Sequence, residues 1–129
     1  VGVEGDAGLV ARARQNATAN GIDTASFATA NLAAPDPAVS PWMHGPYTHV
    51  LLDPPRAGAL EMLPTVAALH PARIVYVSCH PGSLARDLGV LCTDHGYRLS
   101  GAGVVDMFPH TTHVESIAVL DRPVGTGRR

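Results

Sequence analysis

Cys79 is the residue whose type and position most strongly suggest chemistry. It follows the apolar run Arg73–Ser78, which is typical of a buried strand, and precedes His80 and a helical stretch over Gly82–His95. A thiol at a helix N-terminus lies in the partial positive charge of the helix, which favours the nucleophilic thiolate. A free cysteine also commonly packs as a small apolar residue, so position alone leaves both roles open. Cys92, within the helix, is interpreted as a packing residue.

Two acids also end apolar runs. Asp53 closes the run Tyr47–Asp53 and opens the sequence Asp-Pro-Pro-Arg, which ends at Arg56. The prolines stiffen this turn, which can then hold a flat ring or a methyl donor. A plain strand-to-helix turn is the alternative. Glu4 ends the run Val1–Glu4, where nucleotide-binding folds place an acid that accepts hydrogen bonds from ribose hydroxyls. A solvated turn acid is equally compatible with that position.

Glu115 closes the sequence His-Thr-Thr-His-Val-Glu, which begins at His110. Histidine and glutamate are ligand types suited to zinc. The spacing is unfavourable, because His113 and Glu115 share a face of an expected strand while His110 lies in a loop. Glu115 is otherwise a carboxylate base or a surface acid. A hydrolase pair of Cys79 with His80 is disfavoured, since adjacent residues at a strand end point apart.

The elements that must position these residues alternate between strand and helix, which predicts an α/β fold with a mostly parallel sheet and an antiparallel last pair of strands. Ligands in such sheets lie beyond the carboxyl ends of the strands, so Glu4, Asp53 and Cys79 are expected on one rim. The apolar Tyr47–Asp53 is expected to be buried on both faces. The expected strands are Val1–Glu4, Ser26–Ala30, Tyr47–Asp53, Arg73–Ser78, Tyr97–Ser100 joined to Val104–Met107, and His113–Asp121. The expected helices run from an N-cap at Asp6 to Gly21, over Ala59–His70 with a kink or late start at Pro64, and over Gly82–His95, while 31–46 is expected to be loop.

The amino-acid composition limits the classes of protein to which the chain can belong. The chain has 129 residues, 46% of them hydrophobic, and a formal net charge of −2, which gives no basic footprint for nucleic acid. Its two cysteines favour a reducing cytoplasm, and no apolar run approaches the ~18 residues of a membrane span. We expect one partial domain over 1–121 and a flexible C-terminal tail over 122–129, with no membrane or protein partner.

Four segments, taken together, resemble the RNA 5-methyluridine (uracil-5-)methyltransferase family. Their order and spacing match that family from Val1 to about Leu120. The last segment looks most like the branch that acts on 23S ribosomal RNA, with transfer RNA as the alternative substrate. The segments are Val3–Gly5 with the helix end Gln15–Gly21, Leu52–Gly58, Val75–Cys79 with Pro81 and Leu84–Asp87, and Asp106–Ser116.

The resemblance implies a Rossmann-like, class I S-adenosylmethionine-dependent methyltransferase fold. The chain is then the C-terminal part of a catalytic domain, without the first strand and Gly-rich loop, and we expect this piece alone to be inactive and poorly folded. An iron–sulfur cluster, found in some members, would belong to a missing N-terminal region. The matching site positions are Cys79 as nucleophile, Glu115 as base, Glu4, Asn31 and Asp53 at the cofactor, and Asp53 with Arg56 in the substrate loop.

The implied reaction explains these residue types. The Cys79 thiolate adds to C6 of uracil, C5 accepts the methyl group, and Glu115 removes the C5 proton so that the thiol can leave. The target base must flip out of its stack to be reached. His80 departs from the asparagine that many members have there. A non-catalytic cofactor- or RNA-binding remnant is the alternative, and the pair of Cys79 and Glu115 argues against it, because a binding module needs neither.

Overall fold

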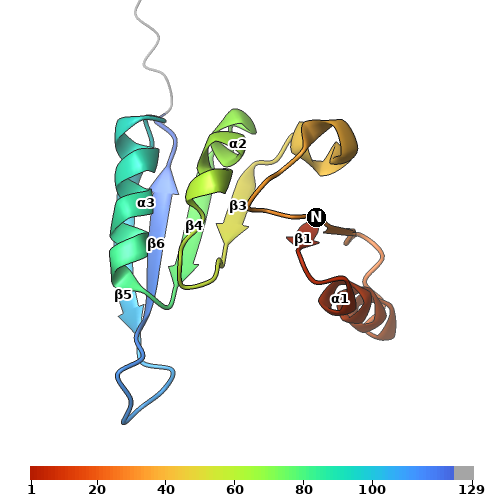
Figure 1. Cartoon of the computed structure of the whole chain (residues 1–129), viewed down its shortest axis with the longest axis horizontal. Coiled ribbons are helices and arrows are strands. Elements are labelled where there is room, and N and C mark those ends of the chain that lie inside the picture. Colours follow the sequence, from red (N-terminus) through yellow and green to blue (C-terminus); the bar gives the residue numbers. More distant parts are fainter. Residues whose placement is uncertain (124–129) are drawn as a thin grey trace, which may run out of the picture. The chain divides into compact units, whose positions relative to one another are not determined.

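The structure is a computed structural model that describes residues 1–123. The stretch Val124–Arg129 of the expected tail lies outside the described residues. The chain divides into two compact units, Val1–Gly45 and Pro46–Arg129 (Figure 1). No helix within residues 1–123 is long and apolar enough to cross a membrane.

The first unit is a strand–helix–strand arrangement. Strand β1 (Gly2–Glu4) pairs in parallel with β2 (Phe27–Thr29), and α1 (Ala7–Ala19) connects them. Asp6 caps α1 as expected, because its side chain accepts a 2.9 Å hydrogen bond from the Leu9 N–H.

The stretch 31–46, expected to be loop, contains two short 3₁₀ helices, Pro37–Val39 and Pro41–His44. Each begins at a proline. A proline costs nothing in the first turn, because the N–H that it lacks would have had no partner there. The expectation of an irregular segment was therefore wrong for these seven positions.

The second unit contains a four-stranded sheet in the order β3-β4-β6-β5. Strands β3 (His49–Leu52) and β4 (Arg73–Ser78) are parallel, whereas β6 (Glu115–Asp121) runs antiparallel to β4 and to β5 (Arg98–Val105). The antiparallel last pair is confirmed, but this sheet is mixed rather than mostly parallel. β5 forms the edge of the sheet. The chain then turns back through a hairpin, so that β6 lies between β5 and β4.

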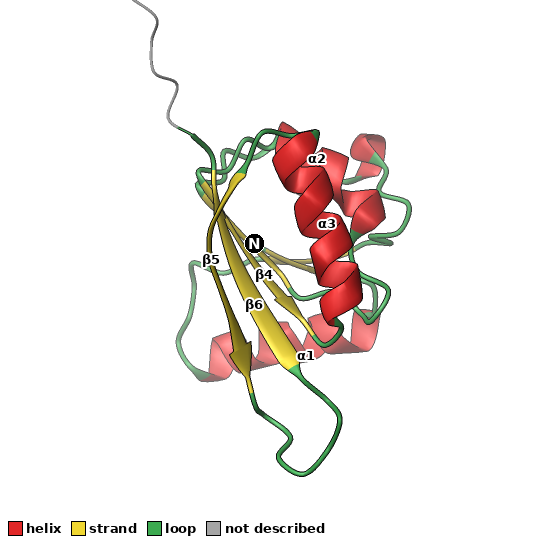
Figure 2. Cartoon of the chain, turned by 90° about the vertical axis from the view of Figure 1, so that its left-hand side faces the viewer, coloured by secondary structure: helices red, strands yellow, loops and turns green. Residues whose placement is uncertain are grey.

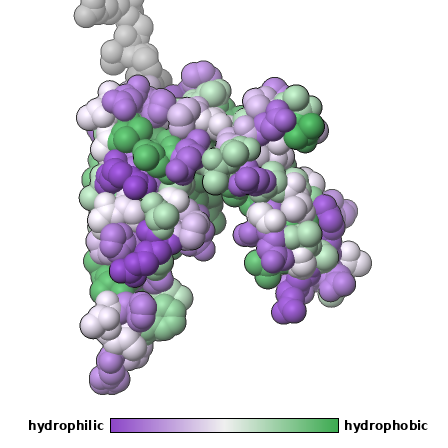
Figure 3. Space-filling view, viewed as in Figure 1, coloured by the Kyte–Doolittle hydropathy of each residue, from purple (hydrophilic) through white to green (hydrophobic). Residues whose placement is uncertain are grey.

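Helices α2 (Leu63–Ala68) and α3 (Pro81–Thr93) lie on the same face of this sheet (Figure 2). The strand residues on that face are buried, among them Ile74, Tyr76 and Leu120. Leu51 is 68% exposed, so the expectation that β3 is buried on both faces was wrong. Within residues 1–123 this strand pairs only with β4, and the two helices cover only one face. Over these helices, polar and apolar residues are interspersed on the surface (Figure 3).

Local sequence explains where these elements begin and bend. Pro64 occupies the first turn of α2, after a 3₁₀ turn at Leu60–Met62, so the late helix start is confirmed. Strand β5 is continuous, with a register irregularity between Leu99 and Gly101. A glycine in a strand commonly marks such a bulge.

Candidate active site

The ends of three strands meet at one edge of the second unit. β3 and β4 are parallel and end at Leu52 and Ser78, so Asp53 and Cys79 follow at the same edge. The last β4–β6 pair is Ser78 with Ser116, so Glu115 lies next to Cys79 in the register of neighbouring strands. The structure thus brings Asp53, Cys79 and Glu115, predicted from separate parts of the sequence, to one rim.

Cys79 is half-buried and lies just before α3. The next residue, His80, is the N-cap: its Nδ1 accepts a hydrogen bond from the Ser83 N–H at 3.1 Å. The His80 N–H donates to Ser78 Oγ, also at 3.1 Å. These bonds fix the backbone on both sides of Cys79. An asparagine oxygen can accept the same capping bond, which gives a physical account of histidine at this position.

The loop from Asp53 to Ala59, here called the proline loop, is bonded to the first turns of α3. Ser83 Oγ lies 2.9 Å from the Arg56 carbonyl oxygen and 3.0 Å from that of His80, so one hydroxyl bridges the proline loop and the turn beside Cys79. Arg86 Nη2 donates to the Ala57 carbonyl at 2.8 Å. The Ala59 N–H donates to Asp87 Oδ2, also at 2.8 Å.

Asp87 is the centre of this attachment and has no exposed surface. Its Oδ2 accepts from the Tyr76 hydroxyl, and its Oδ1 lies 2.7 Å from Arg86 Nη2. A buried carboxylate is tolerated only with such partners. Burial raises the pKa of Tyr76, and the hydrogen bond to Asp87 raises it further, so Tyr76 remains a donor at any physiological pH.

The side chains of Asp53 and Arg56 are exposed. Within residues 1–123 the structure gives neither of them a hydrogen bond or an ion pair to protein, so both are available to a ligand. Glu115 is half-buried and pairs with Val105 across the β5–β6 hairpin. The hairpin loop extends beyond the strands at the same rim (Figure 1).

Glu4 and Asn31 belong to the first unit. Glu4 is the last residue of β1, and its Oε1 accepts from the Asp6 N–H at 3.0 Å. Asn31 Oδ1 accepts from the Ala33 N–H, also at 3.0 Å, and so closes a local turn. That Glu4 shares the rim of Asp53 and Cys79 stays a prediction.

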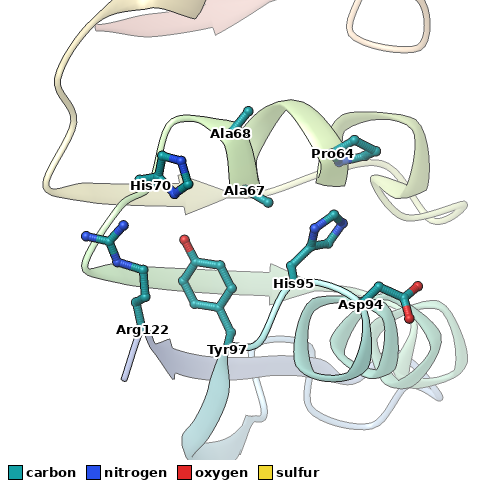
Figure 4. Close-up of a pocket in the computed structure, with 8 residues that line it drawn as sticks. All are labelled: Pro64, Ala67, Ala68, His70, Asp94, His95, Tyr97 and Arg122. Carbon is teal, nitrogen blue, oxygen red and sulfur yellow. The ribbon is translucent and has the colours of Figure 1, made fainter. Parts of the chain in front are cut away.

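Two further groups of residues bear on the alternatives. Among residues 1–123 no three His, Cys, Asp or Glu side chains are grouped to hold a metal ion. A cavity of about 370 Å³ is lined by His70, His95, Tyr97 and Arg122, among others (Figure 4). It lies at the opposite end of β4 from Cys79, since Arg122 follows the residue that pairs with Arg73. None of the sequence-predicted site residues lines it.

Sequence reasoning missed the structural role of Ser83, Arg86 and Asp87. The signal was present, because Ser83, Leu84, Asp87 and Leu91 follow helical spacing and are the buried residues of α3. A buried acid in a helix needs hydrogen-bond donors. For Asp87 one of these donors is the Ala59 N–H, which belongs to the proline loop.

Comparisons with known proteins show the family to which the chain belongs. The sequence model of the tRNA (Uracil-5-)-methyltransferase family matches residues 44–123. The chain belongs to that family. It is 60% identical over 122 residues to the 23S rRNA (uracil(1939)-C(5))-methyltransferase RlmD of Xanthomonas euvesicatoria pv. vesicatoria (strain 85-10), covering 95% of this chain and 27% of that protein. The corresponding protein of Stenotrophomonas maltophilia (strain K279a) is 57% identical, with the same coverage.

A solved structure supports the same fold class. The chain is similar to the crystal structure of Pyrococcus abyssi tRNA (uracil-54, C5)-methyltransferase in complex with S-adenosyl-L-homocysteine, with a TM-score of 0.76 and 34% identity over 92% of this chain and 28% of that one. The chain therefore covers part of a catalytic domain with the Rossmann-like methyltransferase fold, as expected from its sequence. It spans about a quarter of the length of the curated relatives it matches.

Proposed function

We propose that this chain carries the catalytic residues of an S-adenosylmethionine-dependent RNA (uracil-5-)methyltransferase. The observation that supports this most strongly is the β4–β6 register, which makes Cys79 and Glu115 neighbours at the strand ends. A covalent mechanism needs a nucleophile and a base that reach the same ring. We assign uracil C5 methylation to this pair because the chain belongs to the uracil-5-methyltransferase family.

Cys79 forms the covalent bond in this mechanism. Its thiolate adds to C6 of the uracil, the C5–C6 double bond opens, and the electron pair spreads over C5 and the C4 carbonyl. C5 then becomes nucleophilic enough to accept a methyl group. The hydrogen bonds of His80 to Ser78 and Ser83 hold the backbone beside the thiol.

Glu115 completes the reaction. After methylation C5 still carries its hydrogen, and the carboxylate removes that hydrogen as a proton. The electron pair of the C5–H bond re-forms the C5–C6 double bond, and the C6–S bond breaks to release the Cys79 thiolate. Because Glu115 is the first residue of β6, the sheet fixes its backbone.

The residues present fit the cofactor. S-adenosylmethionine supplies an electrophilic methyl group on a sulfonium when bound. Glu4 ends a parallel strand with one carboxylate oxygen engaged by Asp6, and its second oxygen is left to accept from ribose hydroxyls. Asn31 is proposed near the adenine, and Asp53 has an exposed carboxylate on the rim.

We propose 23S ribosomal RNA as the substrate, at the uridine named for the relatives. Its support is the 57–60% identity to proteins named for that activity, compared with 34% to a protein named for transfer RNA. Transfer RNA is the second candidate, because the family is named for it. Arg56 is proposed to contact the RNA from the proline loop.

The deciding experiment traps the covalent adduct. Full-length Glu115→Gln protein is incubated with S-adenosylmethionine and, separately, with 23S ribosomal RNA and transfer RNA from a strain that lacks the gene. A protein–RNA band that survives denaturing electrophoresis is expected with 23S RNA, because C5 keeps its proton and the thiol cannot leave.

Two cysteine variants provide the control. In the Glu115→Gln background, Cys79→Ala removes the band, whereas Cys92→Ala, near the C-terminal end of α3, leaves it. A band only with transfer RNA reassigns the substrate. No band with either RNA, while the cofactor still binds, contradicts the covalent mechanism and favours a binding remnant.

A further inference from the structure

The contacts of Ser83, Arg86 and Asp87 on α3, here called the buried Asp87 network, join two segments that the proposed function needs in register. One is the turn that carries Cys79 and leads into α3, and the other is the proline loop with Asp53 and Arg56. Ser83 bonds to both segments, through the carbonyls of His80 and Arg56. The network therefore connects the proposed nucleophile to the proposed substrate loop through one helical turn.

Three attachments within the proline loop make this connection specific. The carbonyls of Arg56 and Ala57 accept from Ser83 and Arg86, and the Ala59 N–H donates to Asp87. Asp87 also holds Arg86 in place through 2.8 and 2.7 Å contacts to the guanidinium. Removing the charge of Asp87 thus loosens two of the three attachments together.

The backbone of the loop is shaped around the same carboxylate. Gly58 has φ +90, and a Cβ there would lie 2.6 Å from Asp87 Oδ2 and 2.7 Å from Arg86 Nη2. The glycine allows the loop to approach within hydrogen-bond distance of a buried acid. A loop that only linked a strand to a helix would not need this approach.

We propose that Asp87 is a positioning residue that holds the proline loop against α3 and so sets Arg56 relative to Cys79. This inference rests on the proposed function. Arg56 reaches the RNA from an exposed position, and Asp87 acts on it only through the loop backbone. A misplacement of about 1 Å at a reacting centre can lower a rate by about a hundredfold.

The test uses Asp87→Asn in the full-length protein, measured at a temperature where every variant is folded. We expect kcat/KM for RNA to fall by about tenfold or more, and the Ala59 amide to exchange its hydrogen faster. Tyr76→Phe removes one donor to Asp87 and the second acceptor of the Ala59 N–H, but keeps the ion pair and the bond from Ala59 to Asp87. We expect a smaller change in the same direction, and this variant remains available if Asp87→Asn does not fold.

Leu91→Ala is the matched control. Leu91 is fully buried on the same helix but lies outside the network, so its truncation lowers stability without freeing the loop. If Asp87 acts through Arg56, the effect of Asp87→Asn shrinks in an Arg56→Ala background, as a double-mutant cycle would detect. Equal activity losses for Asp87→Asn and Leu91→Ala, or fully additive losses with Arg56→Ala, overturn the proposal.

The proposed function and this inference fail in different ways. If wild-type protein transfers no methyl group to RNA, the function is wrong, and amide exchange at Ala59 still reports whether Asp87 holds the loop. If wild-type protein is active and the Asp87→Asn variant exchanges and reacts like wild type, only the positioning role is wrong.

Discussion

Ser78 at the end of β4 pairs with Ser116 on β6, and both side chains are buried. Cys79 follows the last residue of β4 and Glu115 is the first residue of β6, so this register makes them neighbours at the strand ends although they are 36 positions apart in the sequence. Directly opposite residues of a regular antiparallel pair have Cβ atoms about 5 Å apart. The β4–β6 pair therefore brings the backbones of Cys79 and Glu115 to the same end of the sheet.

The first prediction follows from the separate roles of these two side chains. RNA labelled with tritium at C5 of uridine releases tritium to water only when the base removes it. We expect Glu115→Gln to lower that release by about a hundredfold or more, and Cys79→Ala to abolish it. Tritium release by Glu115→Gln at the wild-type rate would show that another group is the base.

The sequence predicted that Asp53 and Cys79 lie at one edge of the sheet, but it did not predict the contacts of Asp87. Cys79 and Asp53 stand out because each ends an apolar run, and strand ends mark ligand sites in any α/β sheet. Asp87 did not stand out, because an acid in a helix is usually solvated. Helical spacing places Asp87 on the buried stripe of α3, but its hydrogen-bond donor in the proline loop is a long-range contact that local periodicity does not contain.

The same distinction applies to the fold. Pro64 predicted the late start of α2 because proline acts locally, through its missing N–H. The run Val50–Leu52 predicted burial on both faces, but Leu51 is exposed. Burial of a strand depends on which elements cover it, and in the second unit α2 and α3 cover only one face.

The second prediction concerns the histidine beside the nucleophile. His80→Asn keeps an acceptor for the Ser83 N–H, whereas His80→Ala leaves that N–H without its cap. We expect the alanine variant to destabilise the start of α3 by about 1 kcal/mol and the asparagine variant to have little effect. Hydrogen exchange of the first turn of α3 measures this, and equal protection in the two variants would contradict the capping role.

The third prediction compares two glycines. Gly58→Ala must place a Cβ against Asp87 at positive φ, so we expect it to destabilise the protein by more than about 1 kcal/mol. Gly89 lies within α3, and a Cβ added there would meet no atom within 4 Å, so Gly89→Ala is expected to stabilise by about 0.5–1 kcal/mol. Thermal melting distinguishes the two. Comparable melting temperatures would show that the loop can retreat from Asp87.

The fourth prediction is a pH dependence at the far end of the sheet. Arg73 donates to Asp121 from the paired strand at 2.7 Å, and this bond holds the pKa of Asp121 below its ordinary 3.8. A carboxylate with a depressed folded-state pKa stabilises the protein above its unfolded pKa, and that contribution is lost as pH falls through the folded value. The melting temperature should therefore fall less steeply below about pH 4 in Asp121→Asn than in wild type.

Asp23→Asn, at an exposed position in the first unit, is the control and should keep the wild-type slope. Because Arg73 is exposed and Asp121 is only half-buried, high salt should weaken the difference, and a difference unchanged by salt would point to another cause.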